Sequence, residues 1–142
     1  MHERTRGAVS GAAVLLAGLA CVPVFAHHSF AMFDQTREVT LVGTVKEFQW
    51  TNPHSFIHVE VPAGPNSGTW DIELNSPNNL KRQGWRADSI KSGDKVTLRA
   101  NPLRDLGDHK GGLFVAITLP DGTTLGDQTR VEGGKPINVP SP

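Results

Sequence analysis

Cysteine is nearly absent from the sequence: Cys21 is the only one, and it falls in a segment that we expect to be removed. A chain without cysteine forms neither disulfide bonds nor thiolate metal sites, even in an oxidising compartment. Attachment of a lipid to Cys21 is an alternative, but Gly18 stands where lipidation sites usually carry a large aliphatic residue. The mature chain is therefore expected to depend on its hydrophobic core for stability.

No apolar run in the sequence is long enough for a membrane-spanning helix. The longest covers residues 8–20, about 13 residues, whereas a spanning helix needs roughly 20. It follows two arginines and precedes Val24-Phe25-Ala26, which is the order of a secretory signal peptide. We expect residues 1–26 to be cleaved after Ala26, which leaves a periplasmic protein with no membrane insertion; an uncleaved anchor is the alternative.

The sequence also lacks an excess of charge of either sign. It has 14 Lys and Arg and 14 Asp and Glu, and removal of residues 1–26 leaves 12 basic and 13 acidic side chains, a net charge of −1. Nucleic-acid binding usually depends on a basic patch or groove. We therefore expect nucleic acid to be excluded as a partner, which leaves an unknown periplasmic partner or a small ligand.

Motifs of common catalytic sites are missing as well. The sequence has no HExxH pair and no phosphate-binding glycine loop, and Ser29, Ser55 and Ser76 lack the context of a nucleophile elbow. Acidic residues on predicted strands are usually only the solvated side of a sheet. We expect a protein that is not an enzyme.

What the sequence does contain is the alternation of apolar and polar residues that is typical of β-strands. In the first strand the apolar phase slips by one residue after Val45, as a β-bulge produces, and Gly43 is a plausible bend. Ser76-Pro77, followed by Gly84, predicts one short helix. The expected strands cover residues 39–50, 57–61, 70–74, 95–99 and 113–119.

Three strands, a short helix and two more strands is the element order of the OB-fold, a five-stranded, partly open barrel. An immunoglobulin-like sandwich would need about seven strands. We predict an all-β, OB-fold-like barrel over residues 27–125, with its short helix between the third and fourth strands. Residues 126–142 are rich in Gly and Pro and poor in large apolar residues, so a flexible tail is expected.

Several motifs resemble those of an uncharacterised family of small bacterial exported proteins. They are His27-His28-Ser29-Phe30-Ala31-Met32-Phe33-Asp34, Gly43-Thr44-Val45, Trp50-Thr51-Asn52-Pro53-His54, and Ser76-Pro77-Asn78-Asn79-Leu80 before Gly84-Trp85. The resemblance extends over most of the mature chain, from His27 to about Leu125. It implies export and a single domain, and it supplies no activity because the family is a domain of unknown function.

Histidine offers the clearest candidate chemistry. Cleavage after Ala26 would make His27 the N-terminal residue, so its α-amine and imidazole could chelate one ion together. Amine and imidazole nitrogens suit Cu(II) best among the common divalent ions. His28 or His54 would add an imidazole, and cleavage one residue earlier would place His28 third, another arrangement for Cu(II) or Ni(II). Copper is thus the expected ligand, and a frayed terminus without metal is the alternative.

His58 is the remaining candidate metal ligand. If the apolar residues of the second and third strands share one face, His58 lies opposite or near Glu73, whose carboxylate could fix the tautomer of the imidazole. His54 and His58 would share an ion only through a kink at His54, which Pro53 makes possible, because four residues of regular strand separate Cα atoms by about 13 Å. An exposed cross-strand pair is the alternative for His58, and His109 is expected to be simply solvated.

The second functional class is a binding module without metal. OB-folds bind ligands through their second and third strands and the adjoining loops, which here carry Trp50, Asn52, Phe56 and Glu73. We expect Phe56 on the outer face, while Trp50 either stacks on a ligand or packs in the core. A peptide, a glycan or a partner protein is the expected ligand of such a module.

Overall fold

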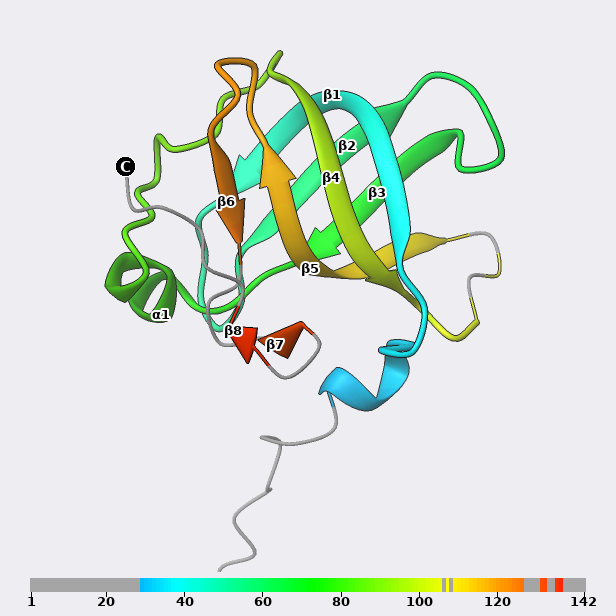
Figure 1. Ribbon diagram of the computed structural model, residues 1–142, viewed down its shortest axis with the longest axis horizontal. Helices are drawn as coiled ribbons and strands as arrows, with labels where there is room; N and C mark the ends of the chain where they lie inside the picture. Colours follow the sequence, from blue (N-terminus) through cyan, green and yellow to red (C-terminus); the bar gives the residue numbers. More distant parts are fainter. Residues whose placement is uncertain (1–28, 106, 108, 127–130, 133–134, 137–142) are drawn as a thin grey trace, which may run out of the picture.

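A computed structural model describes residues 29–105, 107, 109–126, 131–132 and 135–136 (Figure 1). The expected signal segment and the candidate ligands His27 and His28 lie outside these described residues, as does most of the expected tail. Within the described part, no helix has both the length and the apolar character needed to cross a membrane.

Six strands form one sheet that closes into a barrel (Figure 1). The strand order is β3-β2-β1-β4-β5-β6, and β3 also pairs with β5 in parallel, so β1 to β5 close on themselves and β6 lies outside the closed circuit. The prediction of an all-β, OB-fold-like barrel is confirmed. The strands are β1 Val39–Gln49, β2 Phe56–Val61, β3 Gly68–Glu73, β4 Lys95–Pro102, β5 Lys110–Thr118 and β6 Thr124–Gly126.

The first strand is long because it pairs with two neighbours in turn. Residues 39–44 pair with β4 and residues 44–49 pair with β2, and the register shifts between Val45 and Glu47, where the bulge was predicted. At Gly43 the backbones of β1 and β2 approach closely, since a Cβ there would be 2.3 Å from the carbonyl oxygen of Glu60. Only glycine allows this approach of β1 to β2.

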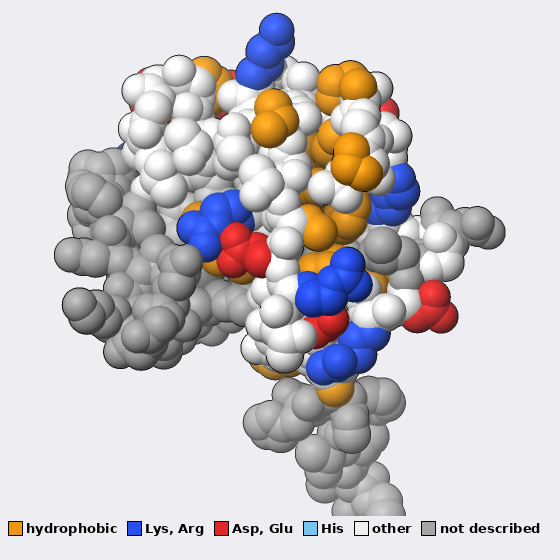
Figure 2. All heavy atoms as spheres, turned by 45° about the vertical axis from the view of Figure 1, so that its right-hand side comes forward, with side chains coloured by type: hydrophobic (Ala, Val, Ile, Leu, Met, Phe, Trp, Pro, Cys, Tyr) orange, Lys and Arg blue, Asp and Glu red, His pale blue; other side chains and the backbone are white. Residues whose placement is uncertain are grey.

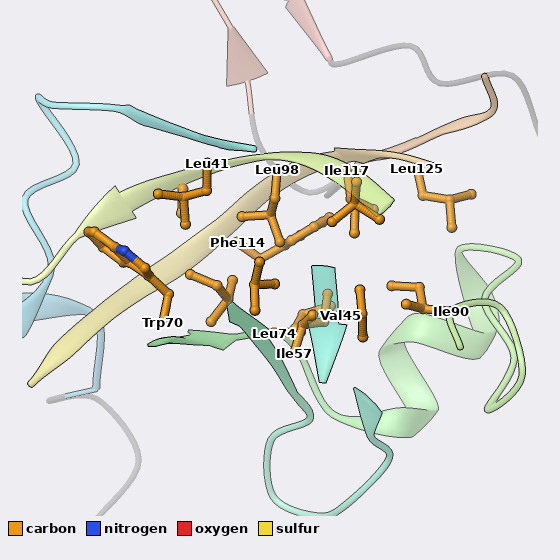
Figure 3. Close-up of a cluster of buried hydrophobic side chains, with 14 of the residues drawn as sticks. Leu41, Val45, Ile57, Trp70, Leu74, Ile90, Leu98, Phe114, Ile117 and Leu125 are labelled. Carbon is orange, nitrogen blue, oxygen red and sulfur yellow. The ribbon is translucent and has the colours of Figure 1, made fainter. Parts of the chain in front are cut away.

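The barrel interior is filled by the buried half of each alternating strand. Ile57, Val59 and Val61 of β2 are buried while the residues between them are half-exposed. Figure 3 shows such side chains from several strands pointing into one cluster, with Phe114 near its centre. Burying one large apolar side chain contributes about 1.5–3 kcal/mol, so this cluster is the main source of stability.

One short helix, α1 (Pro77–Arg82), lies between β3 and β4, as predicted. The Ser76 side chain accepts a hydrogen bond from the backbone N–H of Asn79, and Pro77 occupies the first turn, where its missing N–H costs nothing. Leu80 is buried in the core cluster. The chain leaves the helix through Gly84 at φ 87°, a left-handed conformation suited to glycine.

The segment before β1 is tied to the loop between β4 and β5. It begins with a 3₁₀ turn, η1 (Ser29–Met32), whose Met32 carbonyl accepts a hydrogen bond from the Arg104 backbone at 2.9 Å. Phe33 is buried and forms an isolated β-bridge with Leu103. The start of the described chain is thereby fixed to the β4–β5 loop.

Three features of the fold differ from the sequence-based expectation in extent. The strands β4 and β5 are longer than predicted, because residues 100–102 continue the pairing of β4 with β5 and residues 110–112 pair with β3. β6, which was not predicted, pairs with β5 and buries Leu125. Two very short strands, β7 (Val131–Glu132) and β8 (Lys135–Pro136), pair with each other.

Candidate functional site

The outer face of β2 and β3 carries three of the predicted site residues, Phe56, His58 and Glu73. Strand alternation turns Phe56 and His58 away from the core, and their cross-strand partners on β3 are Glu73 and Asp71, respectively. The sequence placed His58 opposite or near Glu73, two residues from its observed partner. Alternation determines which face a residue occupies but leaves the register open in steps of two, and the hairpin loop sets the rest.

His58 and Asp71 form a direct imidazole–carboxylate pair. The Nδ1 atom of His58 is hydrogen-bonded to the Oδ1 atom of Asp71. The other ring nitrogen, Nε2, is buried and has no hydrogen-bond partner among the described residues. A proton on Nε2 would therefore be buried without an acceptor, which favours the tautomer that carries its proton on Nδ1 and donates it to Asp71.

The second carboxylate oxygen of Asp71 faces another imidazole. His109, directly before β5, places its Nε2 atom 3.6 Å from the Oδ2 atom of Asp71. Gly111 makes room for this arrangement, since a Cβ there would lie 2.9 Å from a Leu103 methyl carbon and 3.4 Å from His109 Nε2. Sequence reasoning treated His109 as merely solvated, and the adjacent Gly111-Gly112 was the available signal that something lies close to this backbone.

His54 belongs to a separate pair on the same face. Its Nδ1 atom lies 2.5 Å from the Oε1 atom of Glu73, and its carbonyl accepts a hydrogen bond from the Thr51 hydroxyl at 3.0 Å. His54 and His58 are therefore each held by a different carboxylate. In the described part of the chain, no three His, Cys, Asp or Glu side chains are grouped so as to hold a metal ion.

The aromatic candidates separate into two environments. The ring of Phe56 stacks on that of His58, with 6.4 Å between centroids and 17° between planes. Trp50 is half-buried, meets Phe48 edge to face at 5.5 Å, and packs against the core cluster. Asn52 is exposed in the loop between β1 and β2. We call the outer surface that carries His54, His58 and His109 with their carboxylate partners the histidine face. Phe56 is its aromatic residue, whereas Trp50 packs against the core.

Charges on the surface are mixed in sign. Figure 2 shows one side of the molecule, on which Lys and Arg side chains lie beside Asp and Glu and apolar side chains gather toward the top.

Near η1, hydrogen bonds from Thr36 to the carboxylate lower the pKa of Asp34, and the cations of Arg104 and Arg37 add to this effect. Neither region forms a continuous patch of one charge.

Solved structures with a similar fold include a nucleic-acid-binding protein. Two crystal structures of Rim1, a mitochondrial single-stranded DNA binding protein from S. cerevisiae, are 11% identical in sequence and cover 59% of this chain. The match covers 92% and 93% of those chains, with TM-scores of 0.46 and 0.44. A comparison with curated proteins finds no match.

The exclusion of nucleic acid as a partner is wrong as an inference from charge. The solved structures to which this chain is similar are of a protein described as binding single-stranded DNA. The likeness itself is too distant to assign any ligand to this chain. The nature of its partner is left open by the fold.

Family membership follows from the sequence over most of its length. The family described as "Family of unknown function (DUF6152)" matches residues 15–114. The match contains the barrel from β1 into β5, together with α1 and the histidine face. The resemblance to an uncharacterised family is confirmed, and the chain belongs to the family of unknown function DUF6152.

Proposed function

We propose that this chain is an exported, non-enzymatic binding protein that holds copper, or a related divalent ion, through the N-terminal histidine of its processed form. The observation that carries the proposal is the position of the N-terminal segment. η1 and Phe33 are fixed to the β4–β5 loop, and that loop carries His109, which lies beside Asp71. The described chain therefore begins on a segment anchored to the loop that carries His109, whose imidazole lies beside the carboxylate of Asp71 on β3.

The donor atoms of the proposed site suit an ion that prefers nitrogen ligands, such as Cu(II). The α-amine and imidazole of His27 would form a chelate, to which His28 or an imidazole of the barrel face is added. On that face His58 is paired with Asp71, and His54 with Glu73. Carboxylates that orient imidazoles in this way are usual around metal ions in proteins. The described residues alone supply too few grouped donors, so the site needs the processed N-terminus.

Export and the absence of catalysis are parts of the same proposal. The order of the first 26 residues is that of a cleaved signal peptide, and only cleavage after Ala26 would create the amine of His27. The OB-fold-like barrel is an architecture that commonly serves as a binding module. No nucleophile with an adjacent base is evident on the histidine face, where the imidazoles contact carboxylates instead.

Copper binding by the correctly processed chain tests the proposal. Protein that begins at His27 is titrated with Cu(II) by calorimetry and electron paramagnetic resonance, beside a version with one residue added before His27. We expect tight one-to-one binding with nitrogen hyperfine structure for the first protein, and at least a tenfold loss of affinity for the second. Equal binding by both proteins would contradict the role of the N-terminal amine, and weak binding by both would contradict the metal.

A metal-free binding module is the second candidate, and one observation favours it. Phe56 lies on the outer face of β2 with its ring half-exposed and stacked on His58. A flat group of a peptide or glycan would stack on such a ring. If copper binding fails, ligands that bind the wild-type chain but not Phe56→Ala would identify this function.

A further inference from the structure

We propose that a groove on the outer face of β1, β4 and β5 binds a small organic monocarboxylate with an apolar chain, and that Lys95 holds the carboxylate. The groove shares no lining residue with the histidine face, so this inference is independent of copper binding. A cavity of ligand size, a row of uncharged side chains and a lysine without a partner together support it.

The groove forms where β1 leaves one neighbour for another. β1 arches over the barrel (Figure 1), and Thr44 is both the last of its residues to pair with β4 and the first to pair with β2. Gly43 and Pro62, the latter directly after β2, line the groove beside this point. The cavity has a volume of about 380 Å³, at the lower end of the roughly 300–1,000 Å³ that is usual for ligand pockets. This volume suits a small ligand.

The floor of the groove is a row of uncharged side chains. Val42 of β1 pairs with Thr97 of β4, which in turn pairs with Thr118 of β5. At 63%, Val42 is the most exposed large apolar side chain in the described part of the chain, on a face that is usually polar in antiparallel sheets. Leu119, directly after β5, also lines the groove. An apolar ligand chain would be stabilised here by the removal of water from these side chains.

Lys95 is charged and is not engaged by the protein. Among the described residues that line the groove it alone carries a charge, and within the described part of the chain its ammonium group makes no hydrogen bond or ion pair. By contrast, Arg99, two residues along β4, donates a hydrogen bond of 3.2 Å to Glu38. On β2, Glu60 accepts a hydrogen bond of 2.7 Å from the Thr69 hydroxyl. The positive charge of Lys95 is thus left for a ligand.

One ammonium group beside hydroxyl groups suits a ligand with a single negative charge. Lys95 lies across from Thr44 and two residues from Thr97, so its ammonium and the two hydroxyls can donate to the oxygens of one carboxylate. A doubly charged phosphate would leave one charge unbalanced, and paired N–H donors of an arginine are absent from the described lining. A monocarboxylate with a short apolar chain therefore matches both the charge and the apolar surface.

Titration of the processed chain with hexanoate, followed through the NMR chemical shifts of assigned backbone amides, tests the proposal. EDTA is present throughout, so that a metal ion has no part in the result. We expect saturable shifts at residues 42–44 and 95–97. Hexylamine, which has the same chain and the opposite charge, should bind at least about tenfold more weakly. Hexanoate that does not bind, or that binds no better than hexylamine, would overturn the proposal and leave the proposed copper site untouched.

Substitutions test the role of Lys95. Lys95→Met removes the charge but keeps most of the side-chain length, and it should weaken hexanoate binding about tenfold. Lys91→Met is the matched control, because Lys91 is exposed but does not line the groove, and salt screens so remote a charge. The control should change the affinity by less than about twofold. Val42→Asp, at an exposed position, should abolish binding by repelling the ligand, and unfolding curves confirm that each variant is folded.

Two further outcomes would overturn the proposal. Equal losses in Lys95→Met and Lys91→Met would mean that the anion is attracted by the overall charge and not by the groove. Shifts of the same amides with protein concentration alone, without ligand, would mean that the groove is a contact between copies of this chain.

Discussion

At the scale of single residues, Gly43 shows how little freedom the crossing of β1 and β2 leaves. A Cβ would lie 2.3 Å from the Glu60 carbonyl oxygen and 2.8 Å from a Val59 methyl carbon. The first of these is backbone, which is hydrogen-bonded in the sheet and has no rotamer through which to move away. A side chain at position 43 would therefore force the two strands apart.

Gly43→Ala should lower the free energy of unfolding by about 3 kcal/mol, at the upper end of overpacking effects. Urea denaturation followed by tryptophan fluorescence measures this loss. Gly64→Ala is the control, because Gly64 has a φ of 93° but open space around its Cβ position. The control should lose only about 1–2 kcal/mol, the cost of a left-handed conformation. Equal losses in the two variants would show that contact with Glu60 is not the cause.

Residue identity alone gave an incomplete account of the candidate site. The outward positions of Phe56 and His58 could be predicted from alternation. The partner of His58 could not, because register depends on the hairpin loop, whose sequence allows more than one closure. The parallel β3–β5 pairing brings His109, directly before β5, close to Asp71 of β3, and no local pattern encodes such a contact.

At the scale of elements, α1 is a helix that depends on its cap. With only the residues Pro77–Arg82, it is too short to be stable by propensity, so the hydrogen bond from Asn79 N–H to Ser76 Oγ and the burial of Leu80 must hold it. Because Leu80 belongs to the core cluster, the helix closes part of the barrel interior. Loss of the cap should therefore be felt as loss of global stability.

Ser76→Ala should cost about 1 kcal/mol of unfolding free energy, the usual effect of removing an N-cap acceptor. Thermal and urea unfolding measure it, and Ser76→Asp serves as the matched variant because a carboxylate can also accept from the Asn79 N–H. We expect Ser76→Asp to retain most of the wild-type stability. If Asp were as damaging as Ala, the serine would be needed for its size and not for its acceptor oxygen.

Elements were predictable where large apolar residues alternate and where caps are explicit. That applies to β2, β3 and α1. Prediction fails on either side of the β4–β5 loop, because Ala100-Asn101-Pro102 and Lys110-Gly111-Gly112 contain no large apolar side chain to alternate. These residues are nevertheless in strands because their backbones complete the ladder between β4 and β5 and, at positions 110–112, the pairing with β3. Pairing in space, not local pattern, extends both strands.

At the scale of the whole molecule, the barrel strands form a closed circuit of pairings. β1 pairs with β2 and β4, β2 with β3, β3 with β5, and β5 with β4, so no barrel strand can leave without breaking two ladders. Core packing also links the barrel to the chain that follows α1, since the ring of Phe114 on β5 meets that of Trp85 edge to face at 5.4 Å between centroids. Such an arrangement is expected to unfold in one cooperative step.

Circular dichroism and tryptophan fluorescence should therefore report a single, coincident unfolding transition, with or without reductant. Phe114→Ala should lower stability by about 3–5 kcal/mol and move both signals together. The comparison is made by urea denaturation at fixed pH. Separate midpoints for the two signals would mean that part of the barrel unfolds independently of the core around Trp85.

The tie between the N-terminal segment and the β4–β5 loop has a consequence for a chain that lacks disulfide bonds. Under the proposed function, an ion bound at the processed N-terminus would reinforce this tie, and it would do so without any redox chemistry. Binding to the folded state alone would add about 2.7 kcal/mol of stability at a free-ion concentration of a hundred times Kd. The lifetime of this protein against proteases would then follow the copper supply of its surroundings.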